Sequence, residues 1–260
     1  MRKFFNTIFT LVFFSFFSFN SIAAEKKIEL LSPEWSFKGF FGKFDRASLQ
    51  RGYQVYIEVC SACHSMKYLS YRNLYEPGGP EFSESQAKAI AASFEVIDGP
   101  NSDGEMFNRP AKLSDKFVMP YENVQAATAA NGGAYPPDMS VLVKARKGGA
   151  DYVYSLLLGY ENPPADMELD DGVYYNKFMY GNKIKMSAPL SDDVVEYSDG
   201  TKATTEQMSK DVVTFLMWAA EPHLEQRHKF GFRVIIYLVI ISILVYFSMK
   251  KIWSRIESKV

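Results

Sequence analysis

Two cysteines and a histidine form the run Cys60-Ser61-Ala62-Cys63-His64, and these are the only cysteines among the 260 residues. A Cys-x-x-Cys-His run is the attachment signature of a c-type haem. Two thiols three positions apart can each form a thioether with one vinyl group of a haem, and the histidine that follows can then ligate the iron. The run therefore predicts one covalent haem c, attached through Cys60 and Cys63, with His64 as an iron ligand.

Two other chemistries use the same residue types. A zinc site needs about four ligands, but there is no second cysteine pair, and the other two histidines, His223 and His228, lie far along the chain. A dithiol redox site would sit in a βαβ pattern, which the sequence does not show. Both alternatives remain open beside covalent haem.

The second axial ligand decides what a haem iron does. An open position is typical of gas binding or catalysis, whereas a filled one is typical of electron transfer. Met186 is the leading candidate, because it lies in a loop that a nearby proline would stiffen. Met119, directly before Pro120, is the second candidate, and His223 and His228 are weaker ones. Ligation by histidine and methionine raises the reduction potential, which suits an electron carrier.

The N-terminus has the features of an export signal. Arg2 and Lys3 precede a strongly apolar stretch over residues 4–19, and small residues for cleavage follow at 21–24. Residues 1–24 are therefore predicted to be a cleaved signal peptide, with a retained anchor as the alternative. Export agrees with the haem motif, because haem is attached to such motifs on the exported side of the membrane.

A second apolar stretch lies near the C-terminus, over residues 230–249. It is long enough to cross a hydrocarbon core of ~30 Å if Arg233 extends towards the headgroups. A buried core helix is the alternative, but apolar residues on every face favour a transmembrane helix. Residues 227–251 are predicted to be the anchor with its flanks, and 252–260 a cytoplasmic tail. The signal peptide implies a single pass through the cell inner membrane, with residues 25–226 in the periplasm.

Residues 25–226 carry 20 basic and 29 acidic side chains, a net charge of −9. An acidic face would steer a basic partner and speed encounter. The same charge could simply keep the domain soluble, and composition does not separate the two. Nucleic acid is not expected as a partner of so acidic a domain.

The elements that must position the haem motif are predicted to be mainly α-helical, in one domain with long loops. One helix runs from about residue 46 into the haem motif, with Asp45 as its N-cap. Gly52 on this helix would let a second helix cross closely. The expected partner is the last helix of the domain, residues 205–220, where Thr204 and Gln207 can form a capping box. Further helices are predicted over 85–94, 139–146 and 150–159, and a long loop over 99–119.

Longer runs of this sequence resemble the cytochrome c1 family over nearly the whole length. These runs are Arg51-Gly52-Tyr53-Gln54-Val55-Tyr56, the haem motif, Ala130-Asn131-Gly132-Gly133-Ala134-Tyr135-Pro136-Pro137-Asp138-Met139-Ser140, Lys144-Ala145-Arg146-Lys147-Gly148-Gly149, Asp151-Tyr152-Val153-Tyr154 and Phe215-Leu216-Met217-Trp218-Ala219-Ala220-Glu221-Pro222. The resemblance implies a cytochrome c-type haem domain with long loop insertions, plus one C-terminal transmembrane helix.

The resemblance also implies roles for single residues. Met186 falls at the family's axial methionine, so His64 and Met186 would be the two iron ligands. Arg146 falls at the arginine that pairs with the haem propionates. Positions that line or shield the haem match Asn131, Pro136, Pro137 and Tyr152. Some bacterial relatives carry an extra disulfide, for which this chain has no cysteine.

The role that the resemblance implies is electron transfer within a quinol–cytochrome c oxidoreductase. The haem would take electrons from the Rieske iron–sulfur protein and pass them to a soluble or anchored cytochrome c. Cytochrome b, the Rieske protein and the lipid bilayer would be neighbours in a dimeric bc1 complex. The chain would be a redox subunit with no substrate-turnover site of its own. The alternatives are a membrane-anchored c-type cytochrome that donates to a terminal oxidase, and a haem sensor or peroxidase with an open iron.

Overall fold

The computed structural model describes residues 28–257, so the predicted signal peptide and the last three residues of the tail lie outside the described residues. Six α-helices, three short helical turns and two small antiparallel sheets make up this part of the chain. The helices are α2 (Arg46–Val55), α3 (Glu84–Ala92), α4 (Val124–Ala130), α5 (Gly149–Leu158), α6 (Thr205–Ala220) and α7 (Leu224–Glu257). The sheets pair β1 (Glu95–Asp98) with β2 (Phe107–Pro110), and β3 (Tyr174–Tyr175) with β4 (Lys183–Ile184). The prediction of a mainly α fold is confirmed.

Helix α2 delivers the haem motif, as predicted. Its N-cap is Asp45, whose carboxylate accepts hydrogen bonds from the backbone N–H of Ala47 at 2.9 Å and Ser48 at 3.3 Å. The helix continues through a π-helical turn, Tyr56–Cys60, that ends on the first cysteine. Such π-turns interrupt α-helices rarely and occur often at functional sites.

Helices α2 and α6 cross at Gly52. A Cβ atom on Gly52 would lie 2.1 Å from the carbonyl oxygen of Asp211 and 2.7 Å from the Cβ of Phe215. Aromatic rings fill the space beside the crossing, with Tyr53 and Tyr56 at centroid distances of 5.8 and 5.9 Å from Phe215. The predicted close crossing of these two helices is therefore confirmed.

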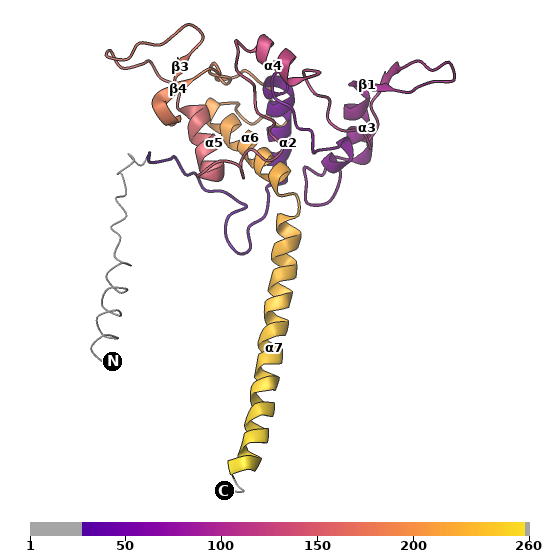
Figure 1. Cartoon of the computed structure of the whole chain (residues 1–260), viewed down its shortest axis with the longest axis vertical. Coiled ribbons are helices and arrows are strands. Elements are labelled where there is room, and N and C mark those ends of the chain that lie inside the picture. The colour runs from indigo at the N-terminus through magenta and orange to yellow at the C-terminus, as the bar shows by residue number, and fades with distance from the viewer. Residues whose placement is uncertain (1–27, 258–260) are drawn as a thin grey trace, which may run out of the picture.

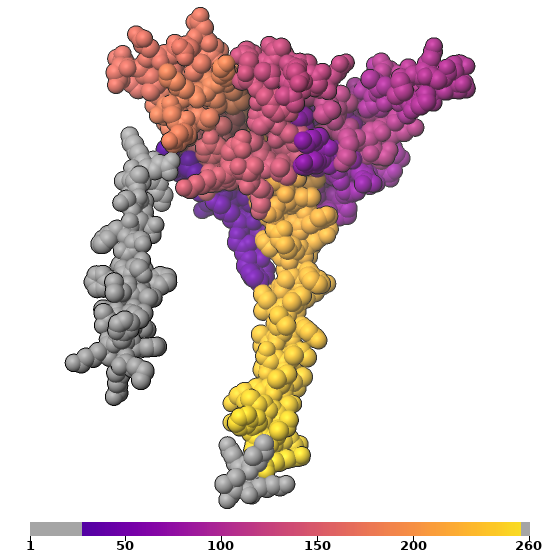
Figure 2. Space-filling view, viewed as in Figure 1, coloured from indigo at the N-terminus to yellow at the C-terminus, as the bar shows by residue number. Residues whose placement is uncertain are grey.

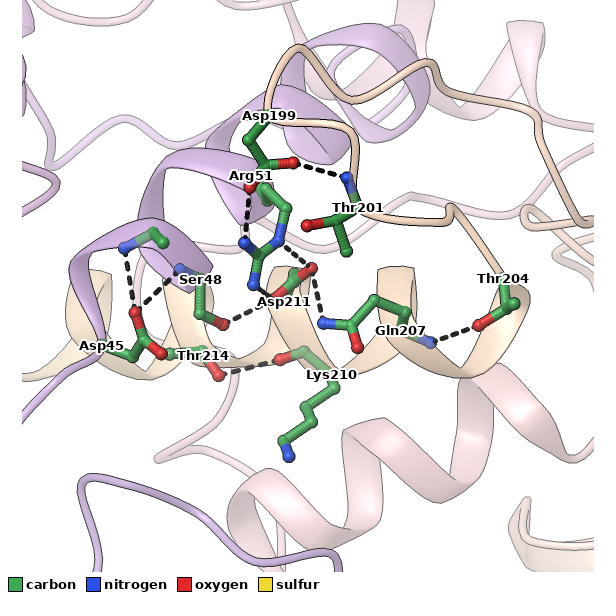
Figure 3. Close-up of polar contacts among 11 residues, drawn as sticks. Asp45, Ser48, Arg51, Asp199, Thr201, Thr204, Gln207, Lys210, Asp211 and Thr214 are labelled. Carbon is green, nitrogen blue, oxygen red and sulfur yellow. Dashed lines mark hydrogen bonds and ion pairs between the residues drawn. The ribbon is translucent and has the colours of Figure 1, made fainter.

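A buried carboxylate joins the two helices beside this crossing (Figure 3). Asp211 of α6 has no exposed surface and accepts from Arg51 Nε at 2.8 Å and Ser48 Oγ at 2.6 Å, both on α2. Arg51 also donates to Asp199 at 2.8 Å, which fastens the segment before α6 to α2. The helix that leads into the haem motif is thus joined to α6 by both close packing and a buried ion pair.

Only one of the two hydrogen bonds of the predicted capping box of α6 forms. The hydroxyl of Thr204 accepts from the backbone N–H of Gln207 at 3.1 Å, so the N-cap is confirmed. The reciprocal bond to the Gln207 side chain does not form: the N–H of Thr204 donates to the carbonyl of Lys202 at 3.0 Å, and Gln207 Nε2 donates to Asp211 at 2.9 Å.

The predicted helices over 85–94 and 150–159 are confirmed as α3 and α5, but the predicted helix over 139–146 is wrong. That stretch is a series of turns. At its start, the N–H of Met139 donates to the carbonyl of Ser65 at 2.8 Å. At its other end, Gly148 and Gly149 both have positive φ, which a continuing helix does not allow.

The predicted long loop over 99–119 is also partly wrong. Residues 107–110 form β2, which pairs with β1 in register Glu95↔Pro110, so this region is a hairpin that stands out from the side of the domain (Figure 1). Helix α4 was not predicted either.

Helix α7 leaves the domain as a single long rod (Figure 1). Over Leu224–Arg255, its most apolar 18-residue window has a mean hydropathy of 2.4, and none of that window is buried inside the structure. By length and composition this helix fits the predicted single membrane span, and it begins just after Pro222, where α6 has ended.

Candidate haem-binding site

The three residues of the haem motif lie on one tight turn at the end of α2. The backbone N–H groups of Cys63 and His64 both donate to the carbonyl of Cys60, at 3.2 and 2.9 Å. Neither cysteine forms a disulfide in the described part of the chain, and both are half-buried. Burial, with a smaller contribution from Cys63, raises the pKa of the Cys60 thiol to about 12. A thiol held in its protonated form is not the reactive thiolate of a redox dithiol, so the dithiol alternative gains no support.

The ring of His64 is oriented from the side. Its Nδ1 atom lies 2.8 Å from the carbonyl oxygen of Pro137, which places the proton on Nδ1 and leaves Nε2 as the ligand nitrogen. Burial lowers the pKa of His64, although the Pro137 carbonyl and the charge of Asp138 oppose the effect. A neutral imidazole with one oriented nitrogen is the form that ligates a metal. These residues therefore fit a haem iron.

The loop over 131–138 is fastened to the residues that follow His64. The carboxylate of Asp138 accepts from Ser65 Oγ at 2.8 Å and from Lys67 N–H at 3.0 Å. Burial alone would raise the pKa of Asp138, but these donors, together with Ser140, hold it below its usual range. A charged Asp138 thus fixes Pro137 beside the imidazole.

The loop that carries Met186 contacts the same 131–138 loop. Lys185 Nζ donates to the carbonyl of Gly132 at 2.9 Å. On its other side, the hydroxyl of Tyr160 donates to the carbonyl of Met186 at 3.1 Å, and the Met186 side chain is half-buried. The segments of the two predicted iron ligands therefore share one supporting loop, although they are about half the chain apart in sequence.

The remaining predicted residues lie around this loop and around α5. Asn131 ends α4 and donates to the carbonyl of Ala127 at 2.7 Å, and Pro136 is half-buried. Tyr152 donates through its hydroxyl to the sulfur of Met179 at 3.4 Å. Burial raises the pKa of Tyr152, and the nearby charge of Arg146 lowers it. Arg146 itself is exposed, so its pairing with a propionate stays a prediction.

The weaker ligand candidates differ in where they lie. Met119 lines a cavity of about 120 Å³ together with Ser61 of the haem motif, so it is also near the site, although its side chain is 51% exposed. His223 is exposed in the break between α6 and α7. His228 is on α7, and its Nδ1 lies 3.2 Å from the carbonyl of Gly42.

Several supporting residues were not predicted. Tyr56 donates through its hydroxyl to the carbonyl of His64 at 3.1 Å. The other unpredicted residues are those that hold the two loops: Ser65, Lys185 and Tyr160. Of these, only Tyr56 carried a signal in the sequence, because it lies one helical turn before Cys60. For the zinc alternative, no group of three or more His, Cys, Asp or Glu side chains in the described range could hold a metal ion.

Comparison with known proteins gives one consistent match. The model of the Cytochrome C1 family matches residues 35–256. The chain is 47% identical over 246 residues to "Cytochrome c1 1, heme protein, mitochondrial" of Arabidopsis thaliana, which covers 93% of this chain and 79% of that protein. It is 43% identical over 251 residues to "Cytochrome c1" of Rhodospirillum rubrum, covering 90% of this chain and 91% of that one. It is also 48% identical over 240 residues to "Cytochrome b/c1" of Bradyrhizobium diazoefficiens, where the match covers 85% of this chain but 35% of the relative.

Proposed function

The chain belongs to the cytochrome c1 family, and from this premise we propose that it is the electron-transfer subunit of a quinol–cytochrome c oxidoreductase. It accepts single electrons from a Rieske iron–sulfur protein and passes them to a soluble or anchored cytochrome c. The observation that carries the proposal is the turn at Cys60, with the His64 ring held by the Pro137 carbonyl. A haem c bound there supplies a one-electron iron couple.

Each residue of the site has a distinct task in this proposal. Cys60 and Cys63 hold the haem covalently, and His64 Nε2 and the Met186 sulfur are the iron ligands. The Pro137 carbonyl fixes the ring of His64 and makes its Nε2 a stronger donor. The contact of Lys185 with Gly132 supports Met186 as the second ligand, because it holds that loop against the loop that orients His64. A site filled on both sides of the iron suits electron transfer rather than gas binding.

The proposed setting is the cell inner membrane. Residues 1–24 direct export and are removed, residues 25–226 lie in the periplasm, and α7 crosses the membrane once. Cytochrome b is the proposed neighbour, which the names of two relatives support: "Cytochrome b/c1" and "Cytochrome b-c1 complex catalytic subunit, mitochondrial". The assembly would be a dimeric bc1 complex. Quinol oxidation belongs to cytochrome b and the Rieske protein, so this subunit needs no substrate-turnover site.

Purification of the full chain from its own membranes in mild detergent, with haem spectra, tests the proposal. We expect one haem per chain that acid–acetone does not extract, and a b-type cytochrome and an iron–sulfur protein that co-purify. The Cys60→Ala variant should lose the two-point attachment of the haem. Ready binding of carbon monoxide by the native reduced protein would contradict a closed iron. Loss of both partners under every gentle condition would favour a cytochrome that donates to a terminal oxidase.

A further inference from the structure

The segment 35–44 carries four phenylalanines that divide into two pairs. Phe37 and Phe44 are buried in the core, each 5% exposed. Phe40 and Phe41, which lie between them, are 53% and 72% exposed. Two adjacent exposed rings at the tip of a loop place a large apolar area in water, and such patches usually mark a surface that something else covers.

The backbone holds these two rings outward. The N–H of Lys43 donates to the carbonyl of Ser36 at 2.9 Å, which closes the loop at its base. Within it, the N–H of Gly42 donates to the carbonyl of Gly39 at 3.2 Å. A Cβ on Gly42 would lie 2.2 Å from the carbonyl oxygen of Phe37, so the turn is too tight for any other residue there. The tip is therefore a built feature with both ends anchored in the core.

The tip lies against the first turns of α7. The rings of Phe40 and Phe41 have centroids 6.2 and 5.9 Å from that of Phe232, which is itself 43% exposed. His228 Nδ1 lies 3.2 Å from the carbonyl of Gly42. Figure 2 shows this indigo segment reaching down from the domain beside the upper part of α7. Phe232 belongs to the apolar stretch 230–249, so the tip lies at the level where that stretch begins.

Three exposed cationic side chains are close to these rings along the chain. Lys43 follows the tip in sequence, and Lys229 and Arg233 flank Phe232 on α7; all three are exposed. Aromatic rings with lysine and arginine beside them fit the boundary between anionic phospholipid headgroups and acyl chains. The cores of protein interfaces, by contrast, are depleted of lysine. Both the charge and the continuity with α7 therefore favour lipid over a protein partner.

We infer that the tip Phe40–Phe41, with Phe232, inserts into the bilayer interface at the N-terminal end of α7, as a second membrane contact beside the helix. The inference rests on the proposed crossing of the membrane by α7. Its consequence is mechanical: one helix can tilt and rotate about its axis, whereas a helix and a second contact together fix how the haem domain stands on the membrane.

Spin-label accessibility in nanodiscs tests this inference on the full haem-loaded chain. In that form the two native cysteines are consumed by haem attachment, which a covalent haem mass verifies, so one introduced cysteine takes the label. The label is placed in three separate variants: Phe41→Cys at the tip, Ile240→Cys in the middle of α7, and Phe107→Cys, an exposed phenylalanine of the β1–β2 hairpin that is 43% exposed. The discs contain phosphatidylcholine with a minor fraction of phosphatidylglycerol.

The expected result is a ratio of oxygen to nickel-complex accessibility at position 41 that is severalfold above that at 107 and below that at 240. A water-like ratio at 41 with a membrane-like ratio at 240 would overturn the inference and leave the anchor intact. A water-like ratio at 240 would instead contradict the proposed anchor. If the label at 41 is water-exposed in discs but shielded within the purified complex, a protein subunit covers the tip, and the inference is wrong.

Discussion

The His64 imidazole shows how its surroundings orient a single side chain that we propose as an iron ligand. The His64 Nδ1–H donates to the Pro137 carbonyl at 2.8 Å, and burial lowers the pKa of the ring, so the neutral form with an unprotonated Nε2 is favoured. The Met186 loop is held through the backbone carbonyl of Met186 and through the neighbouring Lys185, and not through a hydrogen bond to the Met186 sulfur from any residue between 28 and 257. We therefore expect the proposed second ligand to be the less rigid of the two.

The Met186→Leu variant tests this ligand directly. Leucine has a similar volume but no sulfur, so we expect the haem to stay attached while the sulfur-to-iron absorption band disappears. The reduction potential should fall by a sizeable part of the roughly 0.8 V range over which axial ligands set haem potentials. Redox titration followed by absorbance measures both.

The matched control for this prediction is Met119→Leu. Met119 was the second candidate in the sequence and lines the cavity beside Ser61, but it is 51% exposed. We expect this variant to keep both the band and the potential. If Met119→Leu loses the band and Met186→Leu keeps it, the assignment of the second ligand is wrong.

At the scale of elements, the crossing of α2 and α6 holds the haem motif in place. The contact is made by backbone on both sides at Gly52, and by one fully buried carboxylate, Asp211. Small side-chain movements cannot make room for a larger residue at this crossing, because the atom nearest to a Cβ on Gly52 is a main-chain oxygen.

The Gly52→Ala variant should strongly destabilise the domain. The added methyl would lie 2.1 Å from the Asp211 carbonyl oxygen, so the helices must separate. Overpacking of a core costs about 1–3 kcal/mol, and we expect at least the upper end. Gly231→Ala on α7 is the control, since a Cβ there meets nothing within 4 Å. Denaturant unfolding followed by circular dichroism should show no loss for the control.

Two aspartates on the same arginine allow buried and exposed ion pairs to be compared. Asp211 is fully buried, whereas the side chain of Asp199 is 42% exposed, and both accept from Arg51 at 2.8 Å. Removing one partner of a buried pair costs about 3–5 kcal/mol, while exposed pairs contribute about 0–1 kcal/mol. We therefore expect the loss in free energy of unfolding to be several times larger for Asp211→Asn than for Asp199→Asn. Equal losses in unfolding experiments would contradict the assignment of Asp211 as the central acceptor.

The same elements show what the sequence could and could not predict. Asp45, the helix into Cys60 and the crossing at Gly52 were predictable, because caps and helical spacing are local signals. The stretch 139–146 has helical spacing too, yet it folds as a series of turns, and the positive φ of Gly148 prevents a helix from continuing into α5. The β1–β2 hairpin depends on pairing between strands with mostly exposed residues, which leave little hydrophobic pattern. At the site, the residues of the haem motif could be predicted from their spacing. The role of Asp138 could not, because it accepts hydrogen bonds from residues about 70 positions away in the sequence.

The docking of the N-terminal segment on α5 should depend on pH. Asp151 accepts from Trp35 Nε1 at 2.5 Å and from Lys38 Nζ at 2.9 Å. Burial alone would raise the pKa of Asp151, but these donors hold it below the usual 3.8. A depressed pKa in the folded state means that this stabilisation is complete above about pH 4 and is lost as the pH falls through the folded-state pKa.

The Asp151→Asn variant measures this dependence. At neutral pH we expect its free energy of unfolding to be roughly 1.5 kcal/mol below that of the parent. The reason is that a hydrogen bond to a charged group stabilises a fold more than a hydrogen bond between neutral groups does. The difference should shrink as the pH falls below 4 in a series of unfolding experiments. Asp166→Asn, an exposed residue of the 163–172 loop, should show no such trend. A pH-independent difference would mean that the charge of Asp151 is not what stabilises this contact.

At the scale of the whole molecule, the haem domain and the anchor meet at a short break around Pro222. Glu221 pairs with Lys144 of the domain and, across this break, with Arg227 of α7. Burial alone would raise the pKa of Glu221, but these two cations hold it below its usual range, so it stays charged at neutral pH. The next carboxylate, Glu225 on the first turn of α7, joins α7 to the N-terminal end of α2.

Glu225 links the first turn of α7 to the start of α2, so it can couple the tilt of α7 to the haem motif. Its buried carboxylate accepts from Phe44 N–H at 2.9 Å and from Arg46 at 2.8 and 3.0 Å. Through these bonds, one side chain fixes both the base of the aromatic tip and the start of the helix that ends in the haem motif. The orientation of the haem plane relative to the bilayer should therefore depend on it.

We expect Glu225→Gln to broaden the distribution of haem orientations without loss of haem. Glutamine keeps the shape and one acceptor oxygen, but it leaves the Arg46 charge without its buried partner, so the joint between α2 and α7 loosens. Electron paramagnetic resonance of the ferric haem in oriented membranes measures this spread. The matched control is Glu81→Gln, because Glu81 also pairs with Arg46, at 3.0 Å, but is more exposed and does not belong to α7. If both variants broaden the spread equally, the charge of Arg46 matters and its link to α7 does not; if neither does, the orientation is set by the membrane contacts alone.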